Sequence, residues 1–277
     1  MVMICRNPVR ARFMRNEIAK SASGRSPALF LADLSSQGEI HRLADDLHGS
    51  ISRIDVLINS AGTVFTNREV TVDGLEKTLA VNHIAPFLVT SLLLDLVLAA
   101  PAGRILTLAS GVHSSSLDFS NLHGERHYDF IGAYRRSKLC NILFTYELAR
   151  RLACTAITAN CLSPGRTLTR LGDNLTGLQA IFPWVVKRIP FVLGLPEGGG
   201  RRIVYAATSP ALAGITGRFF LRGRDTRTKP ITYNGEVAER LWNATGALCE
   251  GRGGQWDISP PLSRLFPYHN LRGPVIW

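Results

Sequence analysis

Three polar residues in the middle of the chain have types and spacing that suit proton transfer at a carbonyl or an alcohol. Tyr134 and Lys138 lie in the run AYRRSK, and on a helix residues i and i+4 share a face. A cation close to a phenol favours the phenolate and lowers its pKa, so such a Tyr could exchange a proton near neutral pH. Taken alone, this spacing is also typical of an exposed helix pair. Ser110 ends the run GRILTLAS, where its hydroxyl could hold the substrate oxygen.

Small and polar residues also follow two other apolar runs that read as strands. Small residues at such positions allow a flat cofactor to approach the backbone. In a doubly wound sheet, ligands bind beyond the carboxyl ends of the parallel strands, so these residues are expected to gather with Ser110. They are Asn59, Ala61 and Gly62 after one run, and Pro164, Gly165 and Thr169 after another.

Strand-like and helix-like segments alternate along the chain, which is typical of a parallel sheet covered by helices. The predicted strands cover residues 2–5, 28–31, 55–59, 103–109, 156–162 and 217–221. The predicted helices cover residues 8–20, 37–47, 72–98, 134–152 and 236–248, with a further helix opened by Pro196. Asn82 falls inside the predicted helix 72–98, where Asn is mildly disfavoured. In isolation such an Asn is more often a cap or part of a buried network.

Composition and charge exclude several classes of protein. The net charge is +11, but the Lys and Arg residues are scattered singly and in pairs, which argues against a nucleic-acid binder. A basic surface also suits a phosphorylated cofactor or an acidic membrane face. The five cysteines form no C-x-x-C pair and no His cluster has zinc spacing, so the sequence predicts reduced thiols and no metal site.

No segment reads as a signal peptide or as a membrane-spanning helix, which needs roughly 20 apolar residues. The nearest candidate, residues 178–195, is interrupted by Pro183, Pro190 and the pair Lys187-Arg188. At most it could lie on a membrane surface. The sequence therefore favours a cytoplasmic protein, with membrane association as the alternative.

Several segments together resemble a known family. The runs DVLINSAG, VNHIAPF, GRILTLAS, YRRSKLCNILFTYELARRL and LSPGRTLTRL are similar to the signature segments of the short-chain dehydrogenases/reductases. The runs TSPALAGITGRFF and AERLW resemble the retinol-dehydrogenase-like branch. The resemblance covers about residues 1–250 as one domain, leaving residues 251–277 as an irregular tail. It implies a Rossmann-like, doubly wound parallel α/β sheet, and association into a homo-oligomer.

The resemblance implies a role for each candidate residue. Tyr134 would be the general acid/base, Lys138 would tune it and hold the nicotinamide ribose, and Ser110 would orient the substrate oxygen. Asn82 would anchor a water-linked proton relay behind Lys138. The residues implied to bind the cofactor are Asp33 at the adenine, Asn59, Ala61 and Gly62 along the cofactor, and Pro164, Gly165 and Thr169 beside the nicotinamide, together with Tyr134 and Lys138.

The choice of cofactor depends on the end of the predicted strand 2–5. An acidic residue there would accept a hydrogen bond from the ribose 2′-hydroxyl, whereas Arg fits a 2′-phosphate. This position holds Arg6, with Arg10 and Arg12 nearby. The sequence thus predicts NADP(H) rather than NAD(H), the alternative being that Arg6 is an ordinary surface residue.

One departure from the family pattern is large. Family members carry a first strand and a turn T-G-x-x-x-G-x-G that holds the pyrophosphate, and this chain has no such pattern before Asp33. The predicted fold is therefore a doubly wound sheet that lacks its first strand and its Gly-rich turn. Because the first strand is central in such a sheet, two strands are expected to have one edge without a neighbour.

Two functions remain open from the sequence. The first is an NADP(H)-dependent oxidoreductase that interconverts a carbonyl and an alcohol on an apolar substrate, such as a retinoid or a lipid aldehyde or ketone, with residues 178–195 as an apolar lid. A surface helix pair is equally compatible with those residues. The second is a catalytically silent member of the family that acts as an interaction or regulatory protein.

Overall fold

The computed structural model describes residues 1–21, 26–165 and 196–249. Thr169, the apolar segment 178–195 and the tail 251–277 lie outside the described residues. The elements, in chain order, are β1 (Val2–Cys5), α1 (Pro8–Ser21), β2 (Ala28–Leu31), α2 (Gln37–His48), β3 (Val56–Asn59), α3 (Lys77–Leu79), η1 (Ala80–Ile84), α4 (Ala85–Leu92), α5 (Leu94–Leu98), β4 (Arg104–Leu108), η2 (Phe119–Asn121), α6 (Phe130–Arg151), β5 (Thr158–Ser163), α8 (Pro196–Thr208), η4 (Pro210–Leu212), β6 (Phe219–Leu221), β7 (Arg224–Asp225), η5 (Pro230–Tyr233) and α9 (Gly235–Cys249).

The strands form two sheets. Strand β1 pairs in parallel with β2, and strands β3, β4, β5 and β6 pair in parallel in that order, with β7 antiparallel at the far edge. Within the described ranges no ladder joins β1 to β3, so each of these strands is paired along one side only. The two sheets nevertheless share a core, because Val2, Ile4 and Phe30 pack against the same apolar cluster as the larger sheet. This arrangement matches the predicted sheet without its first strand.

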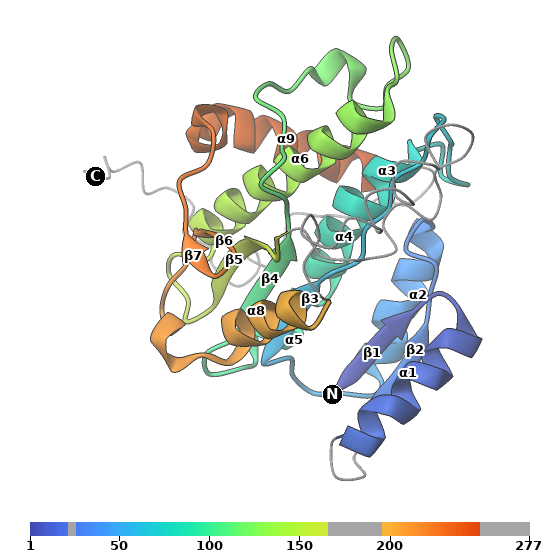
Figure 1. Ribbon diagram of the computed structural model, residues 1–277, viewed down its shortest axis with the longest axis vertical. Helices are drawn as coiled ribbons and strands as arrows, with labels where there is room; N and C mark the ends of the chain where they lie inside the picture. Colours follow the sequence, from blue (N-terminus) through green and yellow to red (C-terminus); the bar gives the residue numbers. More distant parts are fainter. Residues whose placement is uncertain (22–25, 166–195, 250–277) are drawn as a thin grey trace.

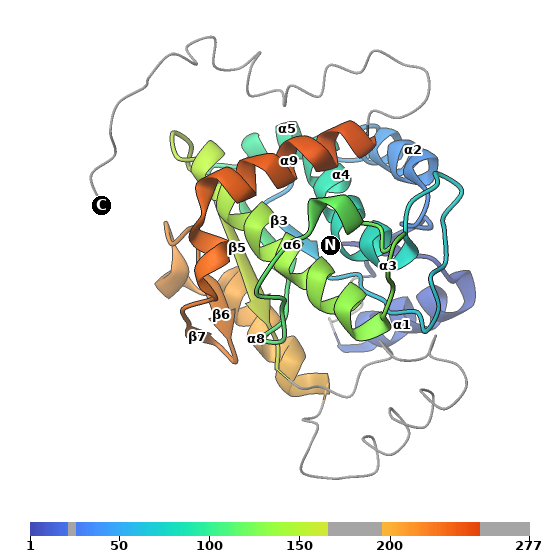
Figure 2. The same ribbon diagram turned by 90° about the horizontal axis from the view of Figure 1, so that it is seen from above.

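Helices cover both faces of the larger sheet, as the Rossmann-like α/β class requires. Helices α1 and α8 lie on one side in Figure 2, and α2, α5 and α9 lie on the other. The main core lies under the second set. In it the rings of Phe87, Phe144 and Trp242 connect α4, α6 and α9, with centroid separations of 4.9 to 5.8 Å. This packing fixes α6, which carries Tyr134 and Lys138, against the sheet.

The predicted long helix over residues 72–98 is wrong in its start and its continuity. The helix begins at Lys77 because Gly74, at φ +80°, turns the chain, and the Glu76 carboxylate accepts from the first free N–H groups at Thr78 and Leu79. It then widens into a π-helical turn over Ala80–Ile84, centred on Asn82. Such bulges occur frequently at functional sites.

The other helices and strands lie closer to their predicted boundaries. Helix α6 starts at Phe130 rather than at Tyr134, because the side chain of Asp129 accepts from the N–H of Gly132 and caps the helix. The short edge strand β7 has no counterpart among the predicted elements. The remaining strands lie within two residues of their predicted ends.

Candidate active site

The structure brings Ser110, Tyr134 and Lys138 together at the carboxyl end of β4. Ser110 follows the strand by two residues, and α6 packs against β4 (Figure 1). The side chain of Ser110 is close enough to that of Tyr134 to lower the pKa of the phenol. The Nζ atom of Lys138 lies 5.7 Å from the centroid of the Tyr134 ring. The three residues therefore bring a hydroxyl, a phenol and an ammonium close to one another.

The protonation of Tyr134 differs from the prediction. Burial raises its pKa above the usual value, and the side chain of Ser110 opposes this rise only in part. Burial therefore outweighs the lowering predicted from Lys138, whose ammonium donates to a backbone carbonyl and not to the phenol. Tyr134 is therefore protonated at neutral pH, ready to donate a proton.

Lys138 is buried, with a relative exposure of 4%. Burial lowers its pKa to about 8, since the charged form is poorly solvated there. Its Nζ donates to the carbonyl oxygen of Leu108 at 2.9 Å, and an ammonium has three N–H groups. The remaining donor capacity suits hydroxyl acceptors such as those of a ribose, so the residues fit the nicotinamide end of a dinucleotide.

Asn82 is fully buried and joins the segment after β3 to α6. Its Oδ1 accepts from the N–H of Thr63 at 2.7 Å. Its Nδ2 donates to the carbonyl of Thr63 and to Oγ of Ser137, both at 2.9 Å. Ser137 precedes Lys138, so Asn82 reaches the lysine through its neighbour. This position is compatible with the predicted proton relay and with the alternative of a buried hydrogen-bond network, so both interpretations stay open.

Three of the candidate residues lie at the end of β3 and just after it. The Asn59 side chain is buried and donates to Oγ1 of Thr90 at 2.9 Å. This hydrogen bond holds the Asn59 amide in the core, and its contact with a cofactor stays a prediction. Ala61 is partly exposed and Gly62 is exposed, which leaves them able to line a flat ligand.

In the two-stranded sheet, Arg6 and Asp33 meet just after the carboxyl ends of β1 and β2. The guanidinium of Arg6 lies 3.9 Å from the Asp33 carboxylate, and both side chains are exposed. Asp33 also accepts from the N–H and the hydroxyl of Ser35. The two residues assigned to the adenosine end are thus adjacent, at the ends of neighbouring strands.

The loop after β5 holds the next candidates. Gly165 has φ +93°, a conformation that favours glycine. The carbonyl of Pro164 accepts a hydrogen bond from the guanidinium of Arg202 on α8. No sequence pattern indicates this contact, because Arg202 and Pro164 are 38 residues apart along the chain.

Three further residues lie at the site without belonging to any of the predicted motifs. Nδ1 of His113 lies 3.0 Å from the carbonyl of Ser110 and orients that loop. Asn141 donates to the same Leu108 carbonyl as Lys138, at 3.0 Å, and His83 lies behind it. The spacing of Lys138 and Asn141, one turn apart on α6, is the sole hint of this contact in the sequence.

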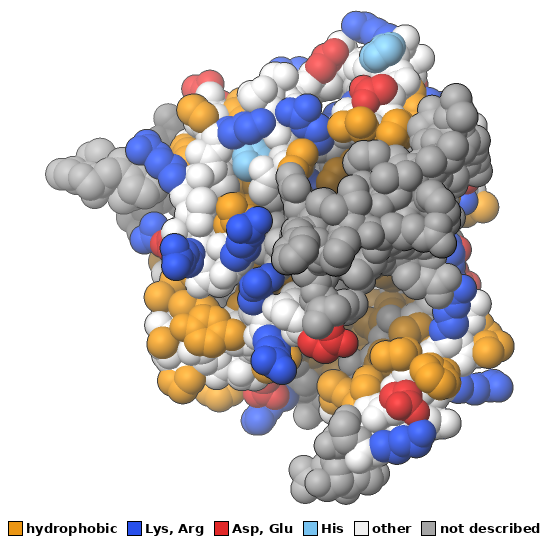
Figure 3. All heavy atoms as spheres, viewed as in Figure 1, with side chains coloured by type: hydrophobic (Ala, Val, Ile, Leu, Met, Phe, Trp, Pro, Cys, Tyr) orange, Lys and Arg blue, Asp and Glu red, His pale blue; other side chains and the backbone are white. Residues whose placement is uncertain are grey.

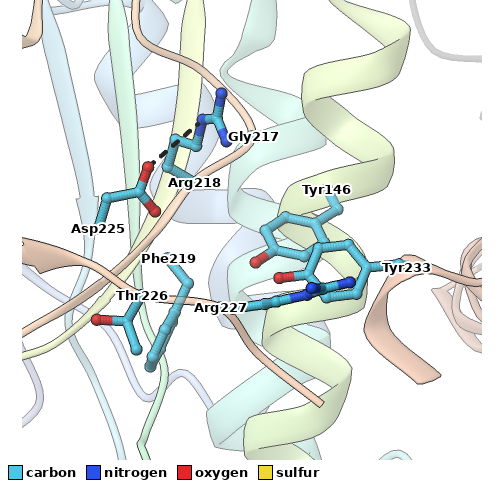
Figure 4. Close-up of a pocket in the computed structure, with 8 residues that line it drawn as sticks. All are labelled: Tyr146, Gly217, Arg218, Phe219, Asp225, Thr226, Arg227 and Tyr233. Carbon is cyan, nitrogen blue, oxygen red and sulfur yellow. Dashed lines mark ion pairs between the residues drawn. The ribbon is translucent and has the colours of Figure 1, made fainter. Parts of the chain in front are cut away.

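A pocket of about 310 Å³ opens at the other end of α6 (Figure 4). Its lining includes Tyr146, Tyr233, Arg218 and Arg227, with Arg218 paired to Asp225 at 3.7 Å. Tyr146 lies about 18 Å along α6 from Tyr134 at 1.5 Å per residue. The pocket is therefore separate from the cluster of Ser110, Tyr134 and Lys138.

The surface carries scattered positive charge, and Figure 3 shows Lys and Arg side chains spread over one face. Hydrophobic side chains gather on this face beside β1 and α1 (Figure 3). Among residues 1–21, 26–165 and 196–249, no helix combines the length and apolar character needed to cross a bilayer.

Known proteins share this fold. The crystal structure of an uncharacterized protein from Mycobacterium paratuberculosis is similar with a TM-score of 0.67 at 26% identity, covering 90% of this chain and 83% of that one. A short chain dehydrogenase from Escherichia coli CFT073, solved in complex with NADPH, has a TM-score of 0.61 at 23% identity, covering 80% of this chain and 85% of that one. These matches define the class as Rossmann-like α/β proteins.

The sequence comparisons then give the family. The model of the short chain dehydrogenases matches residues 1–178. Mouse retinol dehydrogenase 14 is 33% identical over 266 residues, covering 90% of this chain and 78% of the mouse protein. Cattle retinol dehydrogenase 12 is 31% identical over 257 residues, covering 91% of this chain and 78% of the cattle protein. The chain belongs to the short-chain dehydrogenase family of oxidoreductases, in its retinol-dehydrogenase-like branch.

Proposed function

We propose that this chain interconverts a carbonyl and an alcohol on an apolar substrate with NADP(H) as cofactor. The observation that carries the proposal is the meeting of Ser110, Tyr134 and Lys138 at the end of β4. When bound, the nicotinamide supplies or accepts the hydride. A retinoid or a lipid aldehyde or ketone is the substrate class that the relatives and the apolar segment 178–195 favour.

The chain's own residues supply the proton and the orientation. In reduction, the Tyr134 hydroxyl donates its proton to the substrate oxygen while the Ser110 hydroxyl donates a hydrogen bond to that oxygen. In oxidation, the Tyr134 phenolate takes the proton from the alcohol. Lys138, charged below a pH of about 8, stabilises the phenolate and offers N–H donors to the ribose hydroxyls.

The two reaction directions should depend differently on pH. Because the pKa of Tyr134 is raised, the phenol stays protonated and the rate of reduction should be flat between about pH 6 and 9. Oxidation needs the phenolate, so its rate should rise by about tenfold per pH unit from neutrality. The rise should flatten above pH 8, where Lys138 loses its charge. Initial rates in both directions across this range test the assignment, and equal pH profiles would contradict it.

The cofactor preference can be measured by equilibrium binding of NADPH and NADH to the 277-residue chain, followed by nicotinamide fluorescence. If Arg6 contacts the 2′-phosphate, Arg6→Ala should weaken NADPH binding by about 10-fold or more and leave NADH binding unchanged, as loss of a charge-assisted hydrogen bond predicts. Arg53→Ala is the matched control, because Arg53 is also exposed and paired to an Asp. An equal loss for both cofactors would show that Arg6 does not read the phosphate.

A second candidate function is a catalytically silent interaction or regulatory protein. One observation favours it: no ladder among the described strands joins β1 to β3, so each of these strands has one unpaired edge. Folded protein that binds neither NADPH nor NADH would support this candidate. Micromolar NADPH binding would support the enzyme.

A further inference from the structure

The carbonyl of Leu108 is an unusual acceptor at the site. Leu108 is the last residue of β4, one residue beyond the register of β3, which ends opposite Thr107. Its oxygen accepts from Nζ of Lys138 at 2.9 Å and from Nδ2 of Asn141 at 3.0 Å. A carbonyl oxygen has two lone pairs, so the two side chains of α6 use both. The position of the ammonium therefore depends on an oxygen that Asn141 also holds.

The amide of Asn141 is itself held from behind. Because Nδ2 donates to a carbonyl, Oδ1 is an acceptor, and it lies 3.4 Å from Nδ1 of His83. His83 is buried, and burial lowers its pKa to about 4, so the imidazole is neutral at physiological pH. A neutral imidazole that donates through Nδ1 must accept at Nε2. The donor there is the Thr245 hydroxyl of α9, at 2.9 Å.

A chain of buried hydrogen bonds thus runs from α9 to the catalytic lysine. It passes from Thr245 through His83 and Asn141 to the Leu108 carbonyl and Lys138. Each side chain is at most 4% exposed. Since His83 does not change charge in the physiological range, the direction of every donor in the chain is fixed. Buried networks that are fully satisfied hold one arrangement firmly.

We infer that Asn141 is a positioning residue for Lys138, with His83 and Thr245 fixing the Asn141 amide. The inference deepens the proposed function, on which it rests for the role of Lys138. Helix α9, which carries Thr245, thereby helps to hold the active site in place. Lys138 in turn faces Tyr134 on its own helix, with His83 as the titratable group behind Asn141.

The test is a pH titration of Lys138 by NMR on the free chain carrying isotope-labelled lysine, with the signal assigned from Lys138→Arg. Asn141→Ala opens a polar space beside the ammonium that water can fill, and it leaves the Leu108 carbonyl to Lys138 alone. Both changes favour the charged form, so the pKa of Lys138 should rise by at least one unit, a tenfold change in acidity. Asn160→Ala is the matched control, because Asn160 is a buried amide with two hydrogen bonds, to Ile215 and Arg218.

The outcomes separate positioning from general destabilisation. The inference is supported if the pKa of Lys138 rises in Asn141→Ala and does not shift in Asn160→Ala. It is overturned if the pKa of Lys138 is unchanged in both variants or changes equally in both. If Asn141→Ala does not fold, Asn141→Ser carries the same expectation. His83→Gln, whose amide can donate and accept in place of the imidazole, should keep the wild-type titration, while His83→Leu should shift it. The titration is carried out on the free chain, without cofactor or substrate, so its result does not depend on turnover. Absence of turnover in a separate assay would contradict the proposed function but would leave this titration unaffected.

Discussion

Replacing Tyr134 by Phe is expected to lower kcat by about 10²- to 10⁴-fold, the usual contribution of a general acid or base. The change removes one oxygen atom from a partly buried side chain next to Ser110, so the site keeps its shape and loses its proton donor. Cofactor binding, measured by nicotinamide fluorescence, should change little. Turnover with an apolar aldehyde or ketone and NADPH measures the effect.

The same substitution at Tyr146 is the matched control. Tyr146 lies on the same helix, and its hydroxyl is within 3.1 Å of Oγ1 of Thr228, about 18 Å along α6 from Tyr134. Tyr146→Phe should leave kcat within about twofold of the wild type, as expected for a group outside the reaction. If Tyr134→Phe keeps most of the activity, Tyr134 is not the acid/base.

Replacing Asn82 by Ala should destabilise the protein by about 2 to 4 kcal/mol. Each buried polar group that loses its partner costs about 1 to 3 kcal/mol, and the terms are not fully additive. Asn82 makes hydrogen bonds to the N–H and the carbonyl of Thr63 and to Oγ of Ser137, so its loss loosens both the segment after β3 and α6. Urea unfolding monitored by circular dichroism gives the change in free energy, and cofactor affinity should fall as well.

Asn121→Ala provides the comparison for this prediction. Asn121 also makes two hydrogen bonds through its side chain, to Arg126 and His127, but within one exposed loop. Its loss should cost less than about 1 kcal/mol, since the freed groups can bind water. A similar cost at both positions would mean that the Asn82 network contributes no more than a surface turn.

Local sequence patterns gave most of the elements of the fold. The strands are short apolar runs, and their predicted ends lie within two residues of the observed ones, because an apolar run and its flanking Gly or polar residues mark a buried strand directly. The helix around Asn82 was predicted less well. Its start depends on the turn at Gly74 and the cap at Glu76. Its π-helical turn contains Asn82, whose partner Thr63 lies on a separate segment.

The candidate site was predictable in its residue types but not in its contacts. The spacing of Tyr134 and Lys138 and the position of Ser110 after a strand carry the chemistry. The acceptor for Lys138 is a backbone oxygen of Leu108, which no side-chain pattern can indicate. The hydrogen bond from the Asn59 amide to Thr90 could not be predicted either. Thr90 lies on a helix distant in the sequence, so tertiary packing decides the direction of the amide.

The separation of the two sheets has a consequence for local stability. Backbone ladders connect β3 through β6, whereas in the described chain the pair β1–β2 is attached to them by side-chain packing of residues such as Val2 and Phe30. A unit attached in this way can open without unfolding the rest. The amides of β1 and β2 should therefore exchange with solvent through a partial opening of low free energy, while those of β4 and β5 exchange mainly on global unfolding. Arg6 and Asp33 lie on that separately opening unit, so the residues proposed to bind the adenosine end can lose their order while Ser110, Tyr134 and Lys138 keep theirs.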